Sequence, residues 1–165
     1  MDAESGTLLR ALLRGTRTAT LATLRGGAPN ASMVLYLPEQ DFSAFHVRVS
    51  RLAWHTQDMQ DDARVALSIQ ETDTPVRDPQ QLARLTLRGD ATRLNEEGAQ
   101  FERLMTAWLA RYPDAGAIFE LPDFAFWRIA PREGRFVAGF ARTFTLTPAG
   151  LAEAAKTRAA PARGP

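Results

Sequence analysis

Short runs of strand-forming residues, several of them closed by turn sequences such as GGAP and PEQD, constrain this chain more than any other feature. The runs are residues 17–25, 30–37, 42–49, 64–70, 82–94, 124–130 and 135–142. They do not alternate with helices in a strand–helix–strand order, so a parallel Rossmann-type sheet is disfavoured. The pattern predicts a mainly β fold, an antiparallel barrel that is closed or nearly closed, with short helices at its ends.

Three helices are expected beside these runs, one before the first run and two between later ones. Residues 4–14 carry a leucine stripe, and Ser5 is placed to cap their first turn. Residues 53–61 predict a shorter helix. Residues 96–112 give the clearest helical spacing, and Asn95 is placed to cap that helix.

The C-terminal third predicts a hairpin and a tail. The last two strand-like runs are expected to pair around the sequence PREG (131–134). One domain should then span residues 1–147. Residues 148–165 are rich in Ala and Pro and predict a C-terminal tail with a short helix at most.

The composition removes several kinds of chemistry. The chain has no cysteine, which excludes disulfides, thiol nucleophiles and cysteine-ligated metals. Lys156 is its single lysine, so a Schiff base elsewhere is excluded. Only His46 and His55 are histidines, so a three-histidine metal site is impossible, and we predict no metal site built by the protein.

Charge and hydropathy indicate a soluble cytoplasmic protein. The net charge of +1 gives no support for nucleic-acid binding through bulk electrostatics. The first residues carry acids where a secretion signal needs bases, and no apolar stretch is long enough to span a membrane.

Residues 45–59 form the strongest candidate site. Strand alternation places His46, Arg48 and Ser50 on one face, pointing out of the barrel, with the apolar residues between them facing the core. Arg51 follows, and then the start of the second helix. Because a helix N-terminus offers unpaired N–H groups, this arrangement suits a phosphate. The alternative is a solvated strand face followed by a surface helix.

Other constellations are weaker. No Gly-x-Ser-x-Gly elbow accompanies the histidines, so a Ser–His–acid triad is disfavoured. Adjacent carboxylates such as Glu96 and Glu97 are typical of solvated helix ends. Trp108 and Tyr112 fit the apolar face of the helix over 96–112.

Six segments taken in order resemble a known family. They are LLRGTRTATLATL, PNASMVLYL, SRLAWHTQDMQDDARVALSI, ARLTLRGDATRL, LARYPDA and DFAFWRIAPREGRFVAGFAR, and they run from about residue 7 to residue 145. In this order and spacing the chain resembles the pyridoxamine 5′-phosphate oxidase-like flavoproteins, and within them the heme-utilisation branch. The resemblance implies an FMN-binding split barrel, an antiparallel Greek-key type barrel of six to seven strands.

The resemblance also implies a homodimer with two FMN sites at its interface, and we expect that interface to bury above roughly 2,000 Å². Arg48 or Arg51 would supply a counter-charge for the phosphate. The residues implied along the flavin ring are Asn30, Ala31, Ser32, Met33 and Val34, and those implied around the phosphate are Val49, Ser50, His55, Thr56 and Gln57.

Two departures from the family pattern affect these expectations. Gln57 stands where relatives usually carry Arg or Lys, so one phosphate counter-charge is lost. The C-terminal sequence AAKTRAAPARGP lacks the Arg-x-His type motif of the vitamin oxidases, so pyridoxamine phosphate is not the expected substrate.

The sequence therefore predicts an FMN-dependent oxidoreductase acting on an unidentified small molecule, with no catalytic residue assigned, because the flavin carries the chemistry. Two alternatives stay open at this stage: a heme-binding or heme-degrading protein of the same fold, and a non-catalytic flavin carrier or sensor. The cofactor is expected to be FMN, with F420 and heme as alternatives. The expected partners are a second copy of the chain and the small-molecule substrate, with no nucleic acid and no membrane.

Overall fold

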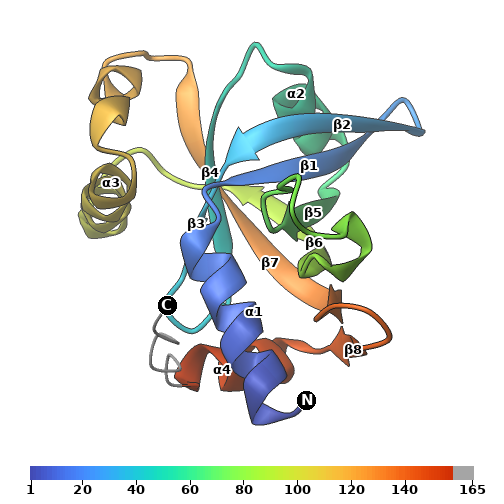
Figure 1. Cartoon of the computed structure of the whole chain (residues 1–165). Helices are drawn as coiled ribbons and strands as arrows, with labels where there is room; N and C mark the ends of the chain where they lie inside the picture. The colour runs from blue at the N-terminus through green and yellow to red at the C-terminus, as the bar shows by residue number, and fades with distance from the viewer. Residues whose placement is uncertain (158–165) are drawn as a thin grey trace.

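The computed structural model describes residues 1–157 (Figure 1). Its strands are β1 (Thr18–Arg25), β2 (Ala28–Leu35), β3 (Leu37–Pro38), β4 (Phe45–Ser50), β5 (Arg64–Gln70), β6 (Arg84–Arg93), β7 (Phe124–Val137) and β8 (Thr143–Leu146). Its helices are α1 (Ala3–Gly15), α2 (Trp54–Asp61), α3 (Ala99–Arg111) and α4 (Pro148–Lys156), with 3₁₀ turns η1 (Pro79–Gln81) and η2 (Pro113–Phe119). Among these helices, none is long and apolar enough to cross a membrane.

The strands form one antiparallel sheet in the order β2-β1-β5-β6-β7-β4-β3, and β8 pairs with β7. This confirms the predicted mainly β, antiparallel split barrel. Helices α1 and α4 lie together at one end of the barrel, and α2 lies at the other end (Figure 1). Within the described residues no ladder joins β2 to β4, yet both strands line one cavity. We call the space between β2 and β4 the seam.

The predicted hairpin around PREG is wrong. β7 passes through this sequence as a single strand of 14 residues and pairs along the whole of β6. The pairing shifts by one residue between Arg88 and Gly89, so Gly89 lies opposite Pro131. A bulge bends a strand without ending it, and it also tolerates a proline that cannot donate to the ladder. The reversal falls later instead, at residues 138–142, where Gly139 has a φ of +110°.

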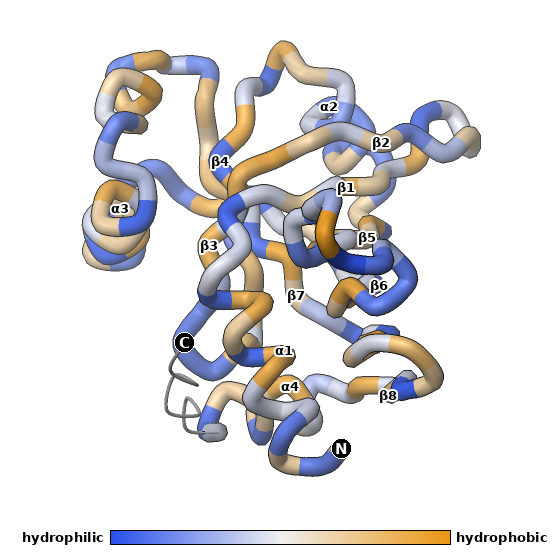
Figure 2. Tube along the Cα trace, viewed as in Figure 1, coloured by the Kyte–Doolittle hydropathy of each residue, from blue (hydrophilic) through white to orange (hydrophobic). Residues whose placement is uncertain are grey.

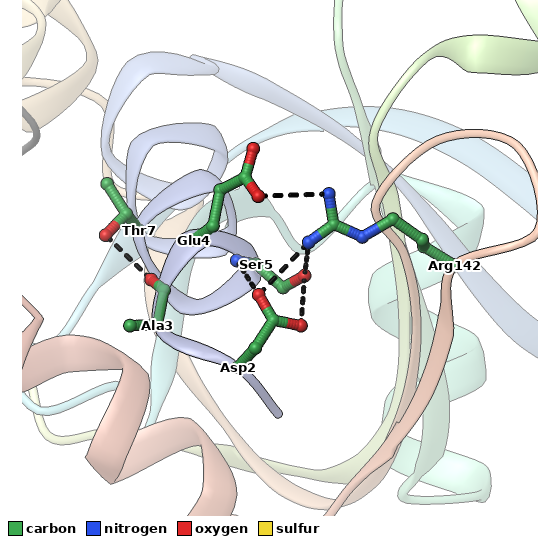
Figure 3. A network of polar contacts seen from close by, with 6 residues as sticks. All are labelled: Asp2, Ala3, Glu4, Ser5, Thr7 and Arg142. Atoms are coloured by element: carbon green, nitrogen blue, oxygen red, sulfur yellow. Dashed lines mark hydrogen bonds and ion pairs between the residues drawn. The ribbon is translucent and has the colours of Figure 1, made fainter.

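Helix α1 is capped by Asp2 and not by Ser5. The Asp2 carboxylate accepts a hydrogen bond from the Ser5 backbone N–H at 2.9 Å. Arg142, from the connection between β7 and β8, then donates to Asp2 at 3.0 Å and to the Ser5 hydroxyl at 2.7 Å (Figure 3). The Ser5 side chain is thus buried under an arginine from the other end of the sequence, and that contact joins α1 to the β7–β8 hairpin.

Helix α3 begins at Ala99 after Gly98, so the expected cap by Asn95 is also wrong. The segment before the helix is held elsewhere, because the Glu96 carboxylate accepts the backbone N–H of Phe126 at 2.9 Å. At its other end the Tyr112 hydroxyl lies 2.6 Å from the Tyr36 carbonyl and 2.7 Å from the Arg17 carbonyl. Both ends of α3 are therefore fixed to the barrel.

Residues 1–157 form two apolar clusters. The larger fills the barrel and includes residues of α1 and α4, and the hydrophilic segments gather on connections such as the one between β5 and β6 (Figure 2). The smaller lies between α3 and the outer surface of the sheet and contains Leu104, Trp108, Tyr112 and Phe126. Strand β4 is consequently buried on both faces. His46 is 1% exposed and Arg48 6%, so the expectation that they face solvent is wrong, because α3 and η2 cover that face.

The expected short helix after Pro148 is confirmed as α4. Its Leu151 and Ala154 side chains belong to the larger core, and α4 packs against α1. The remainder of the expected tail, residues 158–165, lies outside the described residues.

The bulge at Gly89 gives a stability prediction. A Cβ at this position would lie 2.3 Å from the carbonyl oxygen of Ala130, which is backbone and cannot move aside. We expect Gly89→Ala to lower the free energy of unfolding by about 1–3 kcal/mol, the usual cost of overpacking. Gly15→Ala is the matched control, because nothing lies within 4 Å of its Cβ position. Urea unfolding would contradict this account if the two variants were equally stable.

Candidate functional site

A cavity of about 310 Å³ lies at the seam, enclosed by β2, β4, the start of α2, α3, η2 and the start of β7. A larger groove of about 700 Å³ lies between α1, β8 and α4. The two spaces differ in their buried polar atoms that have no hydrogen-bond partner. The residues that line the seam cavity include three with such an atom: Arg48, His55 and Trp108. Within residues 1–157, no residue that lines the larger groove has one. We therefore identify the seam cavity as the candidate site. Its lining is mostly apolar and consists of Met33, Val34, Leu35, Arg48, Val49, Ser50, Ala53, His55, Trp108, Ile118 and Phe124.

The cavity brings together half of the residues expected from the sequence. These are Met33, Val34, Arg48, Val49, Ser50 and His55. Asn30, Ala31, Ser32, Arg51, Thr56 and Gln57 are not among its lining residues. The sequence reasoning missed Leu35, Ala53, Trp108, Ile118 and Phe124, and three of these arrive from α3, η2 and β7, far along the chain. Nothing in their local sequence marks them as part of a site.

The N-terminus of α2 meets the cavity without a side-chain cap. Ala53 is its N-cap and has no side chain that can accept a hydrogen bond, although its carbonyl accepts the backbone N–H groups of Thr56 and Gln57. His55 and Thr56 stand in the first turn as predicted. The His55 Nε2 and the Thr56 Oγ1 are both buried and have no partner in the described part of the chain. Burial lowers the pKa of the His55 imidazole below its ordinary value, and the nearby Asp58 carboxylate opposes that change only in part.

A buried carboxylate, Asp58, fixes α2 on the sheet. It accepts hydrogen bonds from the Thr23 hydroxyl at 2.7 Å and the Asn30 amide at 3.0 Å, and it pairs with Arg25 at 3.0 Å. Burial opposes ionisation, but these three donors outweigh it and hold the pKa of Asp58 below its ordinary value. Asn30, expected beside a flavin ring, instead has its amide committed to this network. Arg25 also stacks on Trp54, the first residue of α2, at 4.3 Å from the ring centroid.

Arg48, expected to face a phosphate, is committed to an internal ion pair. Its guanidinium donates to Glu96 at 2.8 Å, and the side chain is 2% exposed. The ring of Phe119 lies 4.3 Å from the guanidinium carbon, and the rings of Phe101 and Phe126 lie within 5.8 Å and 5.0 Å. Arg48 therefore forms part of the cavity wall, already neutralised and enclosed by aromatic rings.

The Ser50 hydroxyl is also already engaged in hydrogen bonds within the protein. Its hydroxyl donates to the Asp123 carboxylate in a very short contact, and it accepts the backbone N–H of Leu52 at 3.1 Å. Arg51, at the end of the same strand, is exposed. The rim where a phosphate was expected thus carries a carboxylate, while the nearest buried cation is already paired. A phosphate dianion would therefore form few charge-assisted hydrogen bonds with these groups.

The arrangement of the seam defines a split barrel, in which β2 and β4 line one cavity without pairing with each other. A family model described as "Pyridoxamine 5'-phosphate oxidase" matches residues 7–138, and this chain belongs to that family. The resemblance found in the sequence is thereby confirmed.

The relatives of the chain include proteins named for heme. The chloroplastic heme oxygenase HOZ of Arabidopsis thaliana is 34% identical over 141 residues, which cover 82% of this chain and 41% of HOZ. The heme oxygenase HutZ of Vibrio cholerae is 23% identical over 133 residues, covering 79% and 74%. The solved structure of a heme binding protein from Mycobacterium smegmatis superposes with a TM-score of 0.79 at 29% identity, covering 93% of this chain and 61% of that one. The chain thus spans about two fifths of the length of HOZ.

His46, the other histidine, lies away from the cavity and predicts a pH dependence. Its Nε2 lies 2.8 Å from Glu39, which also binds Arg103. Burial lowers the pKa of His46 below its ordinary 6.5; Glu39 opposes this, and Arg103 and Arg128 add to it. Below pH 6.5 the unfolded chain therefore takes up a proton that the folded protein does not. The free energy of unfolding should fall from pH 7 toward pH 5, by at most about 1.4 kcal/mol per pH unit for one histidine.

Urea unfolding at pH 7, 6 and 5 measures this slope. His46→Gln should reduce it, and the part that remains comes from His55, whose pKa is also lowered. Identical slopes for the parent and His46→Gln would show that His46 is not held neutral.

Proposed function

We propose that this protein binds heme in the seam cavity and acts in the oxidative breakdown of heme. The observation that carries the proposal is the cavity itself, a mostly apolar space with an uncommitted imidazole, His55, at its edge. The names of the relatives HOZ and HutZ support the same activity. The expectation of an FMN-dependent oxidoreductase is therefore replaced here by the alternative that the sequence left open.

The residues of the cavity suit a planar apolar ring with an anionic edge. Val34, Ile118 and Phe124 offer apolar walls that exclude water. The first turn of α2 offers the backbone N–H groups of Trp54 and His55 to a carboxylate, since the helix lacks a side-chain cap and the Ala53 carbonyl accepts those of Thr56 and Gln57. Heme supplies iron chemistry with dioxygen when it is bound, and the polarity and access of the surrounding pocket decide how that chemistry runs. The chain's own contribution is to enclose and orient the ring.

A second copy of the chain would complete the site. About 310 Å³ is the lower end of the usual range for ligand pockets, so one chain provides only part of the walls. Large apolar side chains stand exposed around the opening: Met33 and Leu52 are each 70% exposed, and Trp54 is 62% exposed. We propose that these side chains pack against the second copy across the seam.

This dimer predicts a measurable mass. Light scattering at micromolar concentration should give twice the chain mass, and Trp54→Glu should shift the protein toward the monomer by placing a charge in the interface. Val76→Glu, on the connection between β5 and η1, is the matched control, because Val76 is an apolar side chain that is 94% exposed and does not line the cavity, and it should leave the dimer intact. A stable monomer of the parent would contradict the proposal.

FMN is the second candidate, because one observation favours it. Thr56 Oγ1 is buried without a partner in the first turn of α2, within the described residues. A phosphate oxygen there could accept a hydrogen bond from this hydroxyl. The carboxylate of Asp123 on Ser50 and the pairing of Arg48 with Glu96 oppose it.

Titration of the protein with heme, FMN and riboflavin separates the two candidates. We expect heme to bind with a Soret band distinct from that of free heme. We expect FMN to bind within about threefold of riboflavin, because Arg48, the cation that lines the cavity, is already paired with Glu96, whereas a charge-assisted contact would add roughly 1.5–3 kcal/mol, or tenfold and more. FMN binding more than about tenfold tighter than riboflavin, without a heme complex, would overturn the heme proposal and support FMN.

A further inference from the structure

Four arginines gather where the end of α1 meets the end of α3. Arg111, the last residue of α3, donates to the Arg14 carbonyl at 2.8 Å and also to the Thr16 carbonyl just beyond α1. The Arg111 guanidinium thereby binds the negative end of the α1 dipole. Two further arginines adjoin this contact, one on α1 a turn before Arg14 and the other just before β1. We call the four residues the arginine cluster: Arg10, Arg14, Arg17 and Arg111.

The positive charge of the cluster is not balanced by ion pairs. No carboxylate within residues 1–157 pairs with any of its four members. Burial and the neighbouring charges of Arg10 and Arg111 lower the pKa of Arg14 below its ordinary value. The Nε of Arg10 is buried and has no hydrogen-bond partner in the described part of the chain. Because like charges repel one another, an anionic surface that covered the cluster would be stabilised there.

The acidic side chains of the neighbouring β3–β4 connection are engaged elsewhere. Arg14 reaches this connection by donating to the Gln40 carbonyl at 2.7 Å. On one side of Gln40, Glu39 is paired with Arg103 at 2.9 Å. On the other side, Asp41 accepts a backbone N–H of its own turn at 3.0 Å. The surface at the ends of α1 and α3 therefore keeps an excess of positive charge.

Aromatic rings hold two members of the cluster in position. The guanidinium carbon of Arg14 lies 5.0 Å from the centroid of Phe42, and that of Arg17 lies 5.0 Å from the centroid of Tyr112. A guanidinium held in this way is pre-organised, and its planar donors match carboxylates in a bidentate geometry. The net charge of the chain is only +1, which does not favour a long polyanion such as nucleic acid. The partner that best fits this local surface is a protein with exposed carboxylates.

The cluster lies behind one wall of the seam cavity. Arg17 stacks on Tyr112, and the Tyr112 ring packs on Trp108 with the two ring centroids 4.9 Å apart. Trp108 itself lines the cavity. A protein docked on the cluster would therefore face the cavity across this pair of packed rings.

The proposed function needs electrons from outside the chain. Oxidative breakdown of heme consumes electrons as well as dioxygen. The chain has no cysteine, so it cannot supply these electrons from a pair of thiols. A separate electron donor is required, and the arginine cluster is a charged surface beside the wall of the cavity.

We propose that the arginine cluster docks an acidic electron-carrier protein, which reduces the heme iron in the seam cavity. In each transfer the carrier loses one electron and ferric iron becomes ferrous, and no bond forms or breaks. The role of the docked protein rests on the proposed function, which this inference deepens by naming the class of electron donor and its docking surface.

The first test measures docking by calorimetry, with the full-length protein and no added heme. The probe is a plant-type [2Fe–2S] ferredoxin, a small acidic one-electron carrier. It should bind the parent, and its affinity should fall as salt is raised. Arg17→Glu should weaken binding at least about tenfold, because it sets like charges against each other. Arg84→Glu is the matched control: it makes the same change of charge at an exposed arginine of β6, and it should bind like the parent.

The second test measures electron transfer in the heme-loaded protein. Reduced ferredoxin should reduce the heme of the parent at least about tenfold faster than that of Arg17→Glu, following the loss of docking. Dithionite, which needs no docking surface, should reduce both at the same rate. Arg17→Gln removes the charge without reversing it and should give a smaller loss in both tests. This variant keeps the tests decisive if thermal unfolding shows that Arg17→Glu is misfolded.

The possible failures are distinguishable. If the ferredoxin does not bind the parent, or if both Arg17 variants bind it like the parent, the docking inference is overturned while the heme titration still decides the proposed function. Equal weakening by Arg84→Glu would show unspecific attraction and would also overturn it, as would a DNA duplex that binds through Arg17 in place of the ferredoxin. If the ferredoxin docks through Arg17 but the parent forms no heme complex, the proposed function fails, and the role of electron donor fails with it.

Discussion

The buried carboxylate of Asp58 holds the site in shape. It joins α2 to both strands of the β1–β2 hairpin through Thr23, Arg25 and Asn30. Removing one partner from a buried ionic contact leaves an uncompensated charge and typically costs about 3–5 kcal/mol. Without this anchor, the first turn of α2 would lose its fixed position beside β2. The position of His55 and the width of the seam both depend on that anchor.

The second constraint is that β4 is covered on both faces. Phe45 and Val47 belong to the barrel core, while Arg48 on the other face is enclosed by Glu96 and aromatic rings from α3, η2 and β7. This outer layer brings Trp108 and Ile118 over the seam. It also neutralises the arginine that would otherwise attract an anion. The same packing that closes the cavity makes it apolar, and this is why the proposed ligand is a flat ring rather than a phosphate group.

Local patterns in the sequence predicted much of the fold but less of the site. Period-two alternation assigned His46 and Arg48 correctly to the face opposite the barrel core, since that depends only on strand geometry. Whether this face meets water depends on α3, about 50 residues later, so exposure could not be read locally. The sequence PREG looks like a turn, yet β7 passes through it as a bulge opposite Gly89, with Arg132 as the extra residue, and continues along β6. His55 was found because a helix start has a local signal, whereas Trp108 has none that separates core from cavity lining.

Native mass spectrometry of the protein as purified from cells tests the central claim most directly, because it weighs the chains and the bound molecule together. The account predicts an assembly of two chains that carries heme and releases it on denaturation. Two chains that release FMN would contradict the heme assignment, and a monomer that carries either cofactor would contradict a cavity completed by a second copy.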